Sequence, residues 1–133
     1  MWLDRGMTSD QLAEAYVDAM NHADVARVLT LFAPDGAVHS PLYGTIPATD
    51  FYPALFKDTS AAKLSLRASM SGTRAGHDVV SLWLDSEWAF APGESQPYMS
   101  VDVAELDDSG KITQFYVVFD SAVLRDAFDR RGT

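Results

Sequence analysis

Cysteine is absent from the 133-residue sequence, which excludes a disulfide framework and thiol chemistry. The three histidines, His22, His39 and His77, lie far apart without the spacing of a metal site, so no metal ligand set is expected. The glycine loop that binds phosphates and the common hydrolase and zinc-protease motifs are missing as well. The sequence therefore gives no reason to expect a cofactor.

Positive charge is also scarce. Ten Lys and Arg residues are scattered among nineteen Asp and Glu residues, for a net charge of −9, which argues against nucleic acid as a partner. No apolar run reaches the length of about 18 residues that a membrane span needs, so no membrane partner is expected. The start, Met1 to Gly6, lacks the apolar core of a signal peptide, and the cytoplasm is the default expectation.

The remaining composition is typical of a globular protein, with 47% hydrophobic and 22% charged residues. A chain of this length forms one domain and buries roughly two-thirds of the surface that its unfolded form would expose. Residues 1–7 are interpreted as a leader and residues 8–133 as the single domain.

The first part of the chain predicts helices. Thr8 or Ser9 is a suitable N-cap, and Asp24 is a second one. The first helix has a core-facing stripe at helical spacing, formed by Leu12, Tyr16, Ala19, Met20 and Ala23. The stripe of the second helix ends with Phe32, and we expect the Ala-Pro-Asp-Gly run at 33–36 to terminate it.

A third helix-prone segment runs from Pro47 to Lys57 and contains Pro53. Because proline removes a backbone donor and disfavours helical geometry at the residue before it, we expect two short turns or a kink around Tyr52. The chain ends in a fourth predicted helix, for which Asp120 or Ser121 is the cap.

From Lys63 onward the hydrophobic period changes to two, which predicts strands. Four long strands with short turns between them are expected, at about 63–71, 80–90, 98–106 and 111–119. A short strand pair at 37–45 precedes them. Since helices and strands are segregated, the fold class is α+β, and a strongly curved sheet wrapped around the N-terminal helices would leave an apolar pocket at its open end.

The strand at 98–106 has a carboxylate at its centre, Asp102. Alternation places Asp102 on one face with Tyr98 and Ser100, and Met99, Val101 and Val103 on the other. Hydrophobicity alone favours a solvated Asp102. A role in lining a pocket requires the reverse orientation, with the Met/Val face covered by another subunit.

Three runs, 15–24, 31–38 and 110–120, resemble the ketosteroid isomerase and SnoaL-like branch of the NTF2-like superfamily. The resemblance extends over nearly the whole chain and implies a cone-shaped sheet that cups helices around an apolar pocket. It does not imply one reaction, because this fold is used by isomerases, polyketide cyclases, epoxide hydrolases, dehydratases and binders without catalysis.

The resemblance implies roles for three residues. Tyr16 matches the tyrosine of the first helix that donates a hydrogen bond to the substrate oxygen in the isomerases. Asp102 matches their second donor, a protonated aspartic acid. Tyr52, downstream of Gly44-Thr45, matches the tyrosine that supports the first one.

Two further positions bear on the reaction. The isomerases have an aspartate base immediately before a proline, and here that position is Ser40, before Pro41. A neutral hydroxyl cannot abstract a proton next to a carbonyl unaided, and alternation turns His39 to the opposite face. Asp120 resembles an aspartate of limonene epoxide hydrolases, although it is also well placed as a helix cap.

We therefore expect an enzyme that binds a small apolar carbonyl compound, such as a polyketide, terpenoid or steroid, and stabilises an oxyanion with Tyr16 and Asp102. The reaction would be an isomerisation, cyclisation or elimination without a cofactor, in a homodimer. The expected pocket wall consists of Phe56, Leu84, Ser86, Trp88, Phe115 and Phe119. The alternatives are a non-catalytic module that binds hydrophobic ligands and an epoxide hydrolase-like enzyme that uses Asp120.

Overall fold

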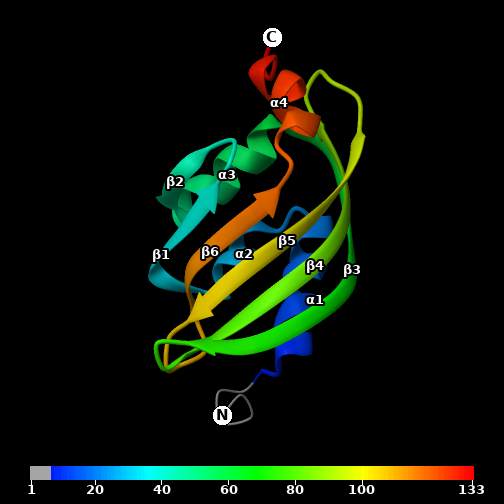
Figure 1. The fold of residues 1–133 in the computed structure, drawn as a ribbon. Helices are drawn as coiled ribbons and strands as arrows, with labels where there is room; N and C mark the ends of the chain where they lie inside the picture. Colours follow the sequence, from blue (N-terminus) through cyan, green and yellow to red (C-terminus); the bar gives the residue numbers. More distant parts are fainter. Residues whose placement is uncertain (1–6) are drawn as a thin grey trace.

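A computed structural model describes residues 7–133 (Figure 1). The helices are α1 (Ser9–Asn21), α2 (Val25–Leu29), α3 (Ala48–Asp58) and α4 (Ala122–Asp129). The strands are β1 (Phe32–Ser40), β2 (Gly44–Pro47), β3 (Thr59–Arg74), β4 (His77–Phe90), β5 (Gln96–Leu106) and β6 (Ile112–Phe119). The leader expected at 1–7 lies, except for Met7, outside the described residues. None of the helices in the described part is long and apolar enough to cross a membrane.

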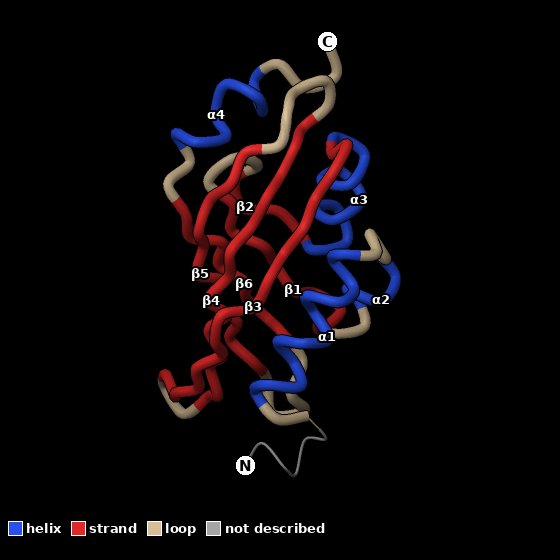
Figure 2. Tube along the Cα trace, turned by 90° about the vertical axis from the view of Figure 1, so that its right-hand side faces the viewer, coloured by secondary structure: helices blue, strands red, loops and turns tan. Residues whose placement is uncertain are grey.

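The strands form one sheet in the order β2-β1-β6-β5-β4-β3. From β3 to β6, neighbouring strands pair antiparallel, which confirms the predicted meander, whereas β1 pairs parallel with β6, so the sheet is mixed. The sheet is curved, and α1, α2 and α3 cover its concave face (Figure 2). Helix α4 lies across one end of the sheet. This arrangement confirms the α+β class and the curved sheet around helices.

The first two helices begin where the caps predict. The Thr8 hydroxyl accepts from the Gln11 amide while the Gln11 side chain accepts from the Thr8 amide, and Asp24 accepts from the Arg27 amide. The stripe of α1 is buried up to Met20. Ala23 does not belong to it, because α1 ends at Asn21 and Ala23 is exposed with a φ of 51°.

The second helix is shorter than predicted. It ends at Leu29, and Phe32 begins β1 instead of closing a helical stripe. The proline in this strand is tolerated because Pro34 precedes the part of β1 that pairs with β2, so no bond with that neighbour is lost. A register shift relative to β6 follows, and a Cβ on Gly36 would lie 2.8 Å from the Ile112 carbonyl oxygen. Glycine therefore permits this close approach.

The break into two short turns that was expected around Tyr52 is wrong. Helix α3 runs from Ala48 to Asp58 as one element that contains Pro53. Pro53 cannot bond the Thr49 carbonyl four residues earlier, but both residues are exposed, so water can solvate that carbonyl. The opposite side of α3 is buried, and it brings Tyr52 into the core.

Strand β5 has the orientation that a pocket requires. Ser100, Asp102, Ala104 and Leu106 are buried, whereas Met99 is 54% exposed. The solvated interpretation of Asp102 is therefore wrong. The carboxyl faces the helices because the apolar neighbours on its face of the sheet, Leu82 opposite it and Ala104 beside it, form part of the core.

Candidate functional site

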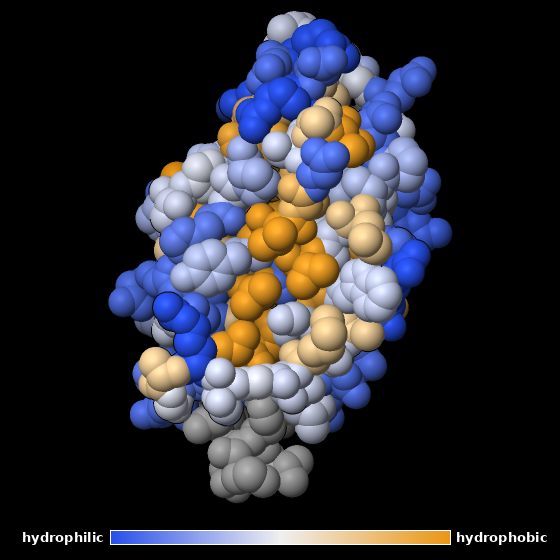
Figure 3. Space-filling model, in the orientation of Figure 1, coloured by the Kyte–Doolittle hydropathy of each residue, from blue (hydrophilic) through white to orange (hydrophobic). Residues whose placement is uncertain are grey.

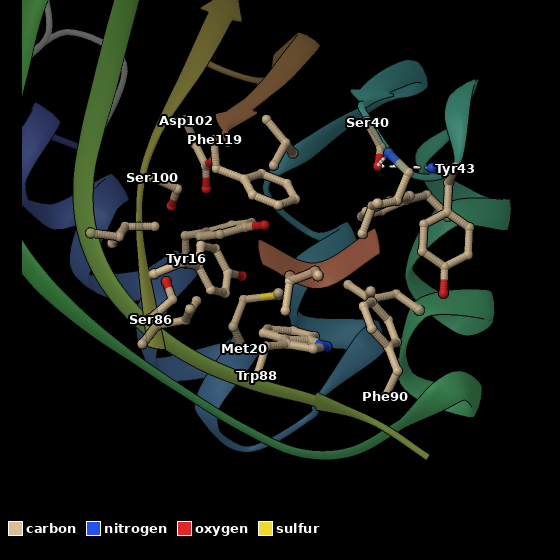
Figure 4. Close-up of a pocket in the computed structure, with 18 residues that line it drawn as sticks. Tyr16, Met20, Ser40, Tyr43, Ser86, Trp88, Phe90, Ser100, Asp102 and Phe119 are labelled. Carbon is tan, nitrogen blue, oxygen red and sulfur yellow. Dashed lines mark hydrogen bonds between the residues drawn. The ribbon is translucent and has the colours of Figure 1, made fainter. Parts of the chain in front are cut away.

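A cavity lies between the concave face of the sheet and helices α1, α3 and α4 (Figure 4). Its volume of about 60 Å³, measured as the space that water centres can occupy, is enough for several waters. The lining is mostly apolar and aromatic. Its members are Tyr16, Met20, Ser40, Leu42, Tyr43, Phe51, Leu55, Leu64, Leu84, Ser86, Trp88, Phe90, Tyr98, Ser100, Asp102, Val117, Phe119 and Leu124.

Two tyrosines from different helices meet beside this cavity. The hydroxyl oxygens of Tyr16 on α1 and Tyr52 on α3 are 2.9 Å apart, and either can donate. Tyr16 lines the cavity, whereas Tyr52 is 0% exposed and stays behind it. When Tyr52 donates to Tyr16, the proton of Tyr16 is free to point into the cavity. Burial raises the pKa of both phenols, so both remain neutral donors at neutral pH.

Asp102 supplies the only carboxyl group in the cavity lining. Its side chain is 5% exposed, and Oδ1 has no hydrogen-bond partner within the described residues. Burial raises the pKa of Asp102 to about 8, because the apolar surroundings disfavour the anion. Asp102 is therefore a neutral acid at neutral pH, and it faces the same cavity as Tyr16 with a proton to donate. The structure thus brings Tyr16, Tyr52 and Asp102 together.

Ser40 also lines the cavity, at the end of β1. Its hydroxyl oxygen accepts from the amides of Leu42 and Tyr43, at 3.1 and 3.0 Å. Figure 4 shows this contact with Tyr43. His39 points to the other face of the sheet, where it bonds Thr45 and Gln114. The position next to Pro41 therefore carries no group that is basic at neutral pH.

Asp120 is placed away from the cavity. It is exposed at the start of α4, where its Oδ1 accepts from the Ala122 amide at 3.1 Å. It is not among the lining residues. Ser121 is the N-cap of α4, and Asp120 precedes it and makes only this local contact, so the structure gives no support to the epoxide hydrolase-like alternative that depends on Asp120.

Four of the six residues expected in the wall do line the cavity, namely Leu84, Ser86, Trp88 and Phe119. Two do not. Phe115 is fully buried behind the Tyr16 ring, with the ring centroids 4.9 Å apart, and Phe56 packs outside against Trp88 at 6.2 Å. Sequence reasoning did not assign Tyr98 and Ser100 to the site, although alternation along β5 had already placed both on the face of Asp102.

Helix α4 closes the cavity at one end. Leu124 contributes to the lining, and Arg125 donates to the Pro41 carbonyl at 2.9 Å. Arg131 pairs with Asp58 at 3.1 Å, and the same carboxylate accepts from the Tyr43 hydroxyl at 2.7 Å. These contacts tie the C-terminal segment to α3 and to the turn after β1.

We searched the described residues for side chains that could act together as metal ligands. Within residues 7–133, no three His, Asp or Glu side chains form a group that could hold a metal ion. The chemistry available to the cavity comes from the two donors that face it, Tyr16 and Asp102, and from neutral hydroxyl groups.

The raised pKa of Asp102 makes stability depend on pH. Between the unfolded value of about 3.9 and the folded value of about 8, the native protein binds one proton more than the unfolded chain. The contribution of Asp102 is therefore fully present below about pH 4, falls by about 1.4 kcal/mol per pH unit, and is lost as the pH rises past about 8.

Asp102→Asn removes this titration with little change in shape. Urea unfolding at about pH 5 and about pH 7 should show the variant gaining about 2 to 3 kcal/mol relative to the parent protein as the pH rises. Comparison with the variant cancels the other titrating groups. An unchanged difference at the two pH values would mean that Asp102 is already ionised in the native protein at pH 5.

Comparison with solved structures places this architecture among known folds. An NTF2-like protein of unknown function from Burkholderia pseudomallei K96243 matches with a TM-score of 0.78 and 18% identity, over 92% of this chain and 98% of that one. A protein with a ketosteroid isomerase-like fold from Catenulispora acidiphila DSM 44928 matches with a TM-score of 0.72 and 16% identity, over 90% and 94%. A putative polyketide cyclase from Pseudomonas putida KT2440 matches with a TM-score of 0.66 and 16% identity, over 92% and 98%.

At these identities the similarity shows the fold alone. A search of curated proteins gave no significant match. The model of the SnoaL-like domain, in contrast, matches residues 13–115, which include most of α1, all elements from α2 to β5 and the first half of β6. With the curved sheet and the cavity beneath it, this match establishes that the chain belongs to the SnoaL-like domain family of the NTF2-like fold.

Proposed function

We propose that this protein is an enzyme that binds a small apolar carbonyl compound in the cavity and stabilises an oxyanion with Tyr16 and Asp102. The observation that supports it most strongly is Asp102, a buried carboxyl with an unpaired Oδ1 in the same cavity as the Tyr16 phenol. A buried polar group without a partner costs about 1 to 3 kcal/mol. A substrate oxygen that accepts from Asp102 would recover this cost.

The donors act on charge that develops during the reaction. When a proton passes from the carbon next to a carbonyl to water or to a basic group of the substrate itself, negative charge grows on the carbonyl oxygen. Two fixed neutral donors in a dry cavity stabilise that charge more than they stabilise the uncharged ketone, which lowers the barrier. The Tyr52 hydroxyl, 2.9 Å from that of Tyr16, supports the first donor.

The proposed reaction class follows from the fact that Ser40 cannot act as a base. Its hydroxyl has no charge, and its oxygen already accepts two backbone amides. We propose an isomerisation, cyclisation or elimination whose substrate needs no strong base from the protein. The putative polyketide cyclase of Pseudomonas putida has the same fold, which is consistent with a polyketide-type substrate.

A non-catalytic hydrophobic-ligand-binding module is the second candidate. The observation in its favour is again Ser40, because a binder needs no base. Against it stands the buried acid, since a ligand-binding cavity gains little from a carboxyl that costs stability as the pH rises. Turnover separates the two candidates, because both should bind a carbonyl compound and only the enzyme should convert it.

Removal of either donor should weaken the binding of an enolate mimic. Phenol, whose ionised oxygen resembles an enolate oxygen, should bind in the cavity, and Tyr16→Phe or Asp102→Ala should each cost about 1.5 to 3 kcal/mol in calorimetry. Tyr116→Phe is the matched control, because Tyr116 stacks on His39 on the other face of the sheet. Unchanged phenol affinity in both donor variants would show that the pair is only structural.

A carboxylate at position 40 should add the missing base. Ser40→Asp can keep the acceptor for the Leu42 and Tyr43 amides and directs a carboxylate into the cavity. We expect it to isomerise cyclohex-3-enone to the conjugated enone about 100- to 10,000-fold faster than the parent protein, followed by absorbance of the product. Ser40→Asn is the control, since it retains an acceptor but not a base. Substrate binding without any gain in turnover would contradict the assignment of Ser40, Tyr16 and Asp102.

The convex face of the sheet is the proposed dimer interface. Figure 3 shows an apolar area across this face. Met99 of β5 is 54% exposed and Val118 of β6 is 55% exposed. We propose that two subunits cover it in a homodimer. Sedimentation should show a dimer at micromolar concentration that Val118→Asp disrupts, whereas Val123→Asp on α4 leaves it intact. A monomeric parent protein would disprove this assembly.

A further inference from the structure

Beyond Tyr16 and Asp102, three polar side chains border the cavity on the neighbouring part of the sheet. They are Ser86 of β4 and Tyr98 and Ser100 of β5, which we call the Ser86 cluster. Ser86 is 3% exposed, and its hydroxyl makes no hydrogen bond of normal geometry within the described residues, although it lies near enough to the Tyr98 phenol to lower the pKa of that group. Its neighbours on the same face of β4, Leu84 and Trp88, are apolar. The buried Ser86 hydroxyl can therefore form a hydrogen bond with a polar atom of a ligand.

The register fixes where this cluster lies relative to Asp102. Ser86 pairs with Tyr98, Leu84 with Ser100, and Leu82 with Asp102. Since a strand rises about 3.3 Å per residue, the Ser86–Tyr98 pair lies about 13 Å along the strand from Asp102, with Ser100 halfway between. Figure 4 shows Ser86, Ser100 and Asp102 around the same cavity. A ligand that reaches both ends needs oxygens at opposite ends of a ring system.

The side chains that line the cavity indicate whether the ligand oxygen at the Ser86 end carries a charge. The cavity lining contains no Lys, Arg or His, and burial raises the pKa of Tyr98 as it does that of Tyr16. A carboxylate or phosphate at the Ser86 end would be buried without a counter-charge, which costs far more than one neutral hydrogen bond returns. A hydroxyl or carbonyl group would instead be bonded by the serine hydroxyl.

We propose that the Ser86 cluster is a second polar subsite, which binds a neutral hydroxyl or carbonyl oxygen at the far end of the substrate. The inference rests on the proposed function for the first oxygen. It narrows the substrate class to compounds with two oxygen functions at opposite ends of about two fused rings, and it excludes acids and phosphates. Ser86 then determines specificity and takes no part in the reaction itself.

The test compares three neutral probes at about pH 6 by calorimetry: 2-naphthol, naphthalene-2,6-diol and naphthalene-2,3-diol. The parent protein should bind the 2,6-diol about three- to tenfold more tightly than 2-naphthol, the gain of one net hydrogen bond. The 2,3-diol, whose oxygens are adjacent, should gain nothing. Ser86→Ala should abolish the advantage of the 2,6-diol and leave 2-naphthol unchanged. Ser81→Ala, on the same strand but the opposite face, is the control.

Failure of this inference differs from failure of the proposed function. Equal affinities of 2-naphthol and the 2,6-diol in the parent protein, or an equal loss of both in Ser86→Ala, would overturn the second subsite alone. If Tyr16→Phe does not weaken 2-naphthol while the 2,6-diol keeps its Ser86-dependent advantage, the oxyanion site is wrong and the subsite stands. If neither probe binds the parent protein, both are wrong.

Discussion

The burial of one carboxyl group without a counter-charge is the constraint on which the rest of the site depends. An anion at Asp102 would lie among apolar side chains with no cation in the cavity lining, so the group is held as the neutral acid. A neutral carboxylic acid donates one hydrogen bond, and the protein leaves Oδ1 without a partner. The cavity is thus complementary to an acceptor that the chain itself does not supply.

The register of β5 decides which of its side chains face that cavity. A slip of β5 by one residue would turn Val101 and Val103 inward and expose Asp102, because side chains alternate between the faces. Pairing on both sides prevents the slip, since Asp102 lies opposite Leu82 of β4 and Val117 of β6. The long meander therefore does more than cover the helices, because it fixes the orientation of the acid.

Much of this architecture could be predicted from the sequence. The capped stripe of α1 and the alternation in β3 to β6 gave the correct elements, since both patterns come from local spacing. The predictions were wrong where strand pairing or solvent exposure outweighs the local preference of a residue. Pro34 and Gly36 are typical of a turn, yet they lie in β1 because its early part has no partner on the side of β2. Pro53 stays within a helix because water can reach the carbonyl that it leaves unpaired.

The site was harder to predict than the fold. The resemblance to a family led to Tyr16, Tyr52, Asp102 and Ser40, and the structure places the last three around or behind the same cavity as Tyr16. The orientation of Asp102 could not be decided from β5 alone, because both of its faces are apolar enough to be buried. Phe56 and Phe115 are aromatic residues near the site, and no sequence pattern separates a residue that lines a cavity from one that packs behind the lining.

The identity of the buried donor bears on whether this cavity catalyses a reaction. An asparagine at position 102 could donate a hydrogen bond at any pH and would not make stability depend on titration. What a carboxyl adds is a proton that can be transferred. With a pKa of about 8, Asp102 lies close enough to neutrality to give its proton to an oxygen that gains charge and to recover it afterwards. Under the proposed function, such an acid in a cavity without a base would favour reactions that begin at the oxygen of the substrate, which include eliminations and cyclisations of activated carbonyl compounds.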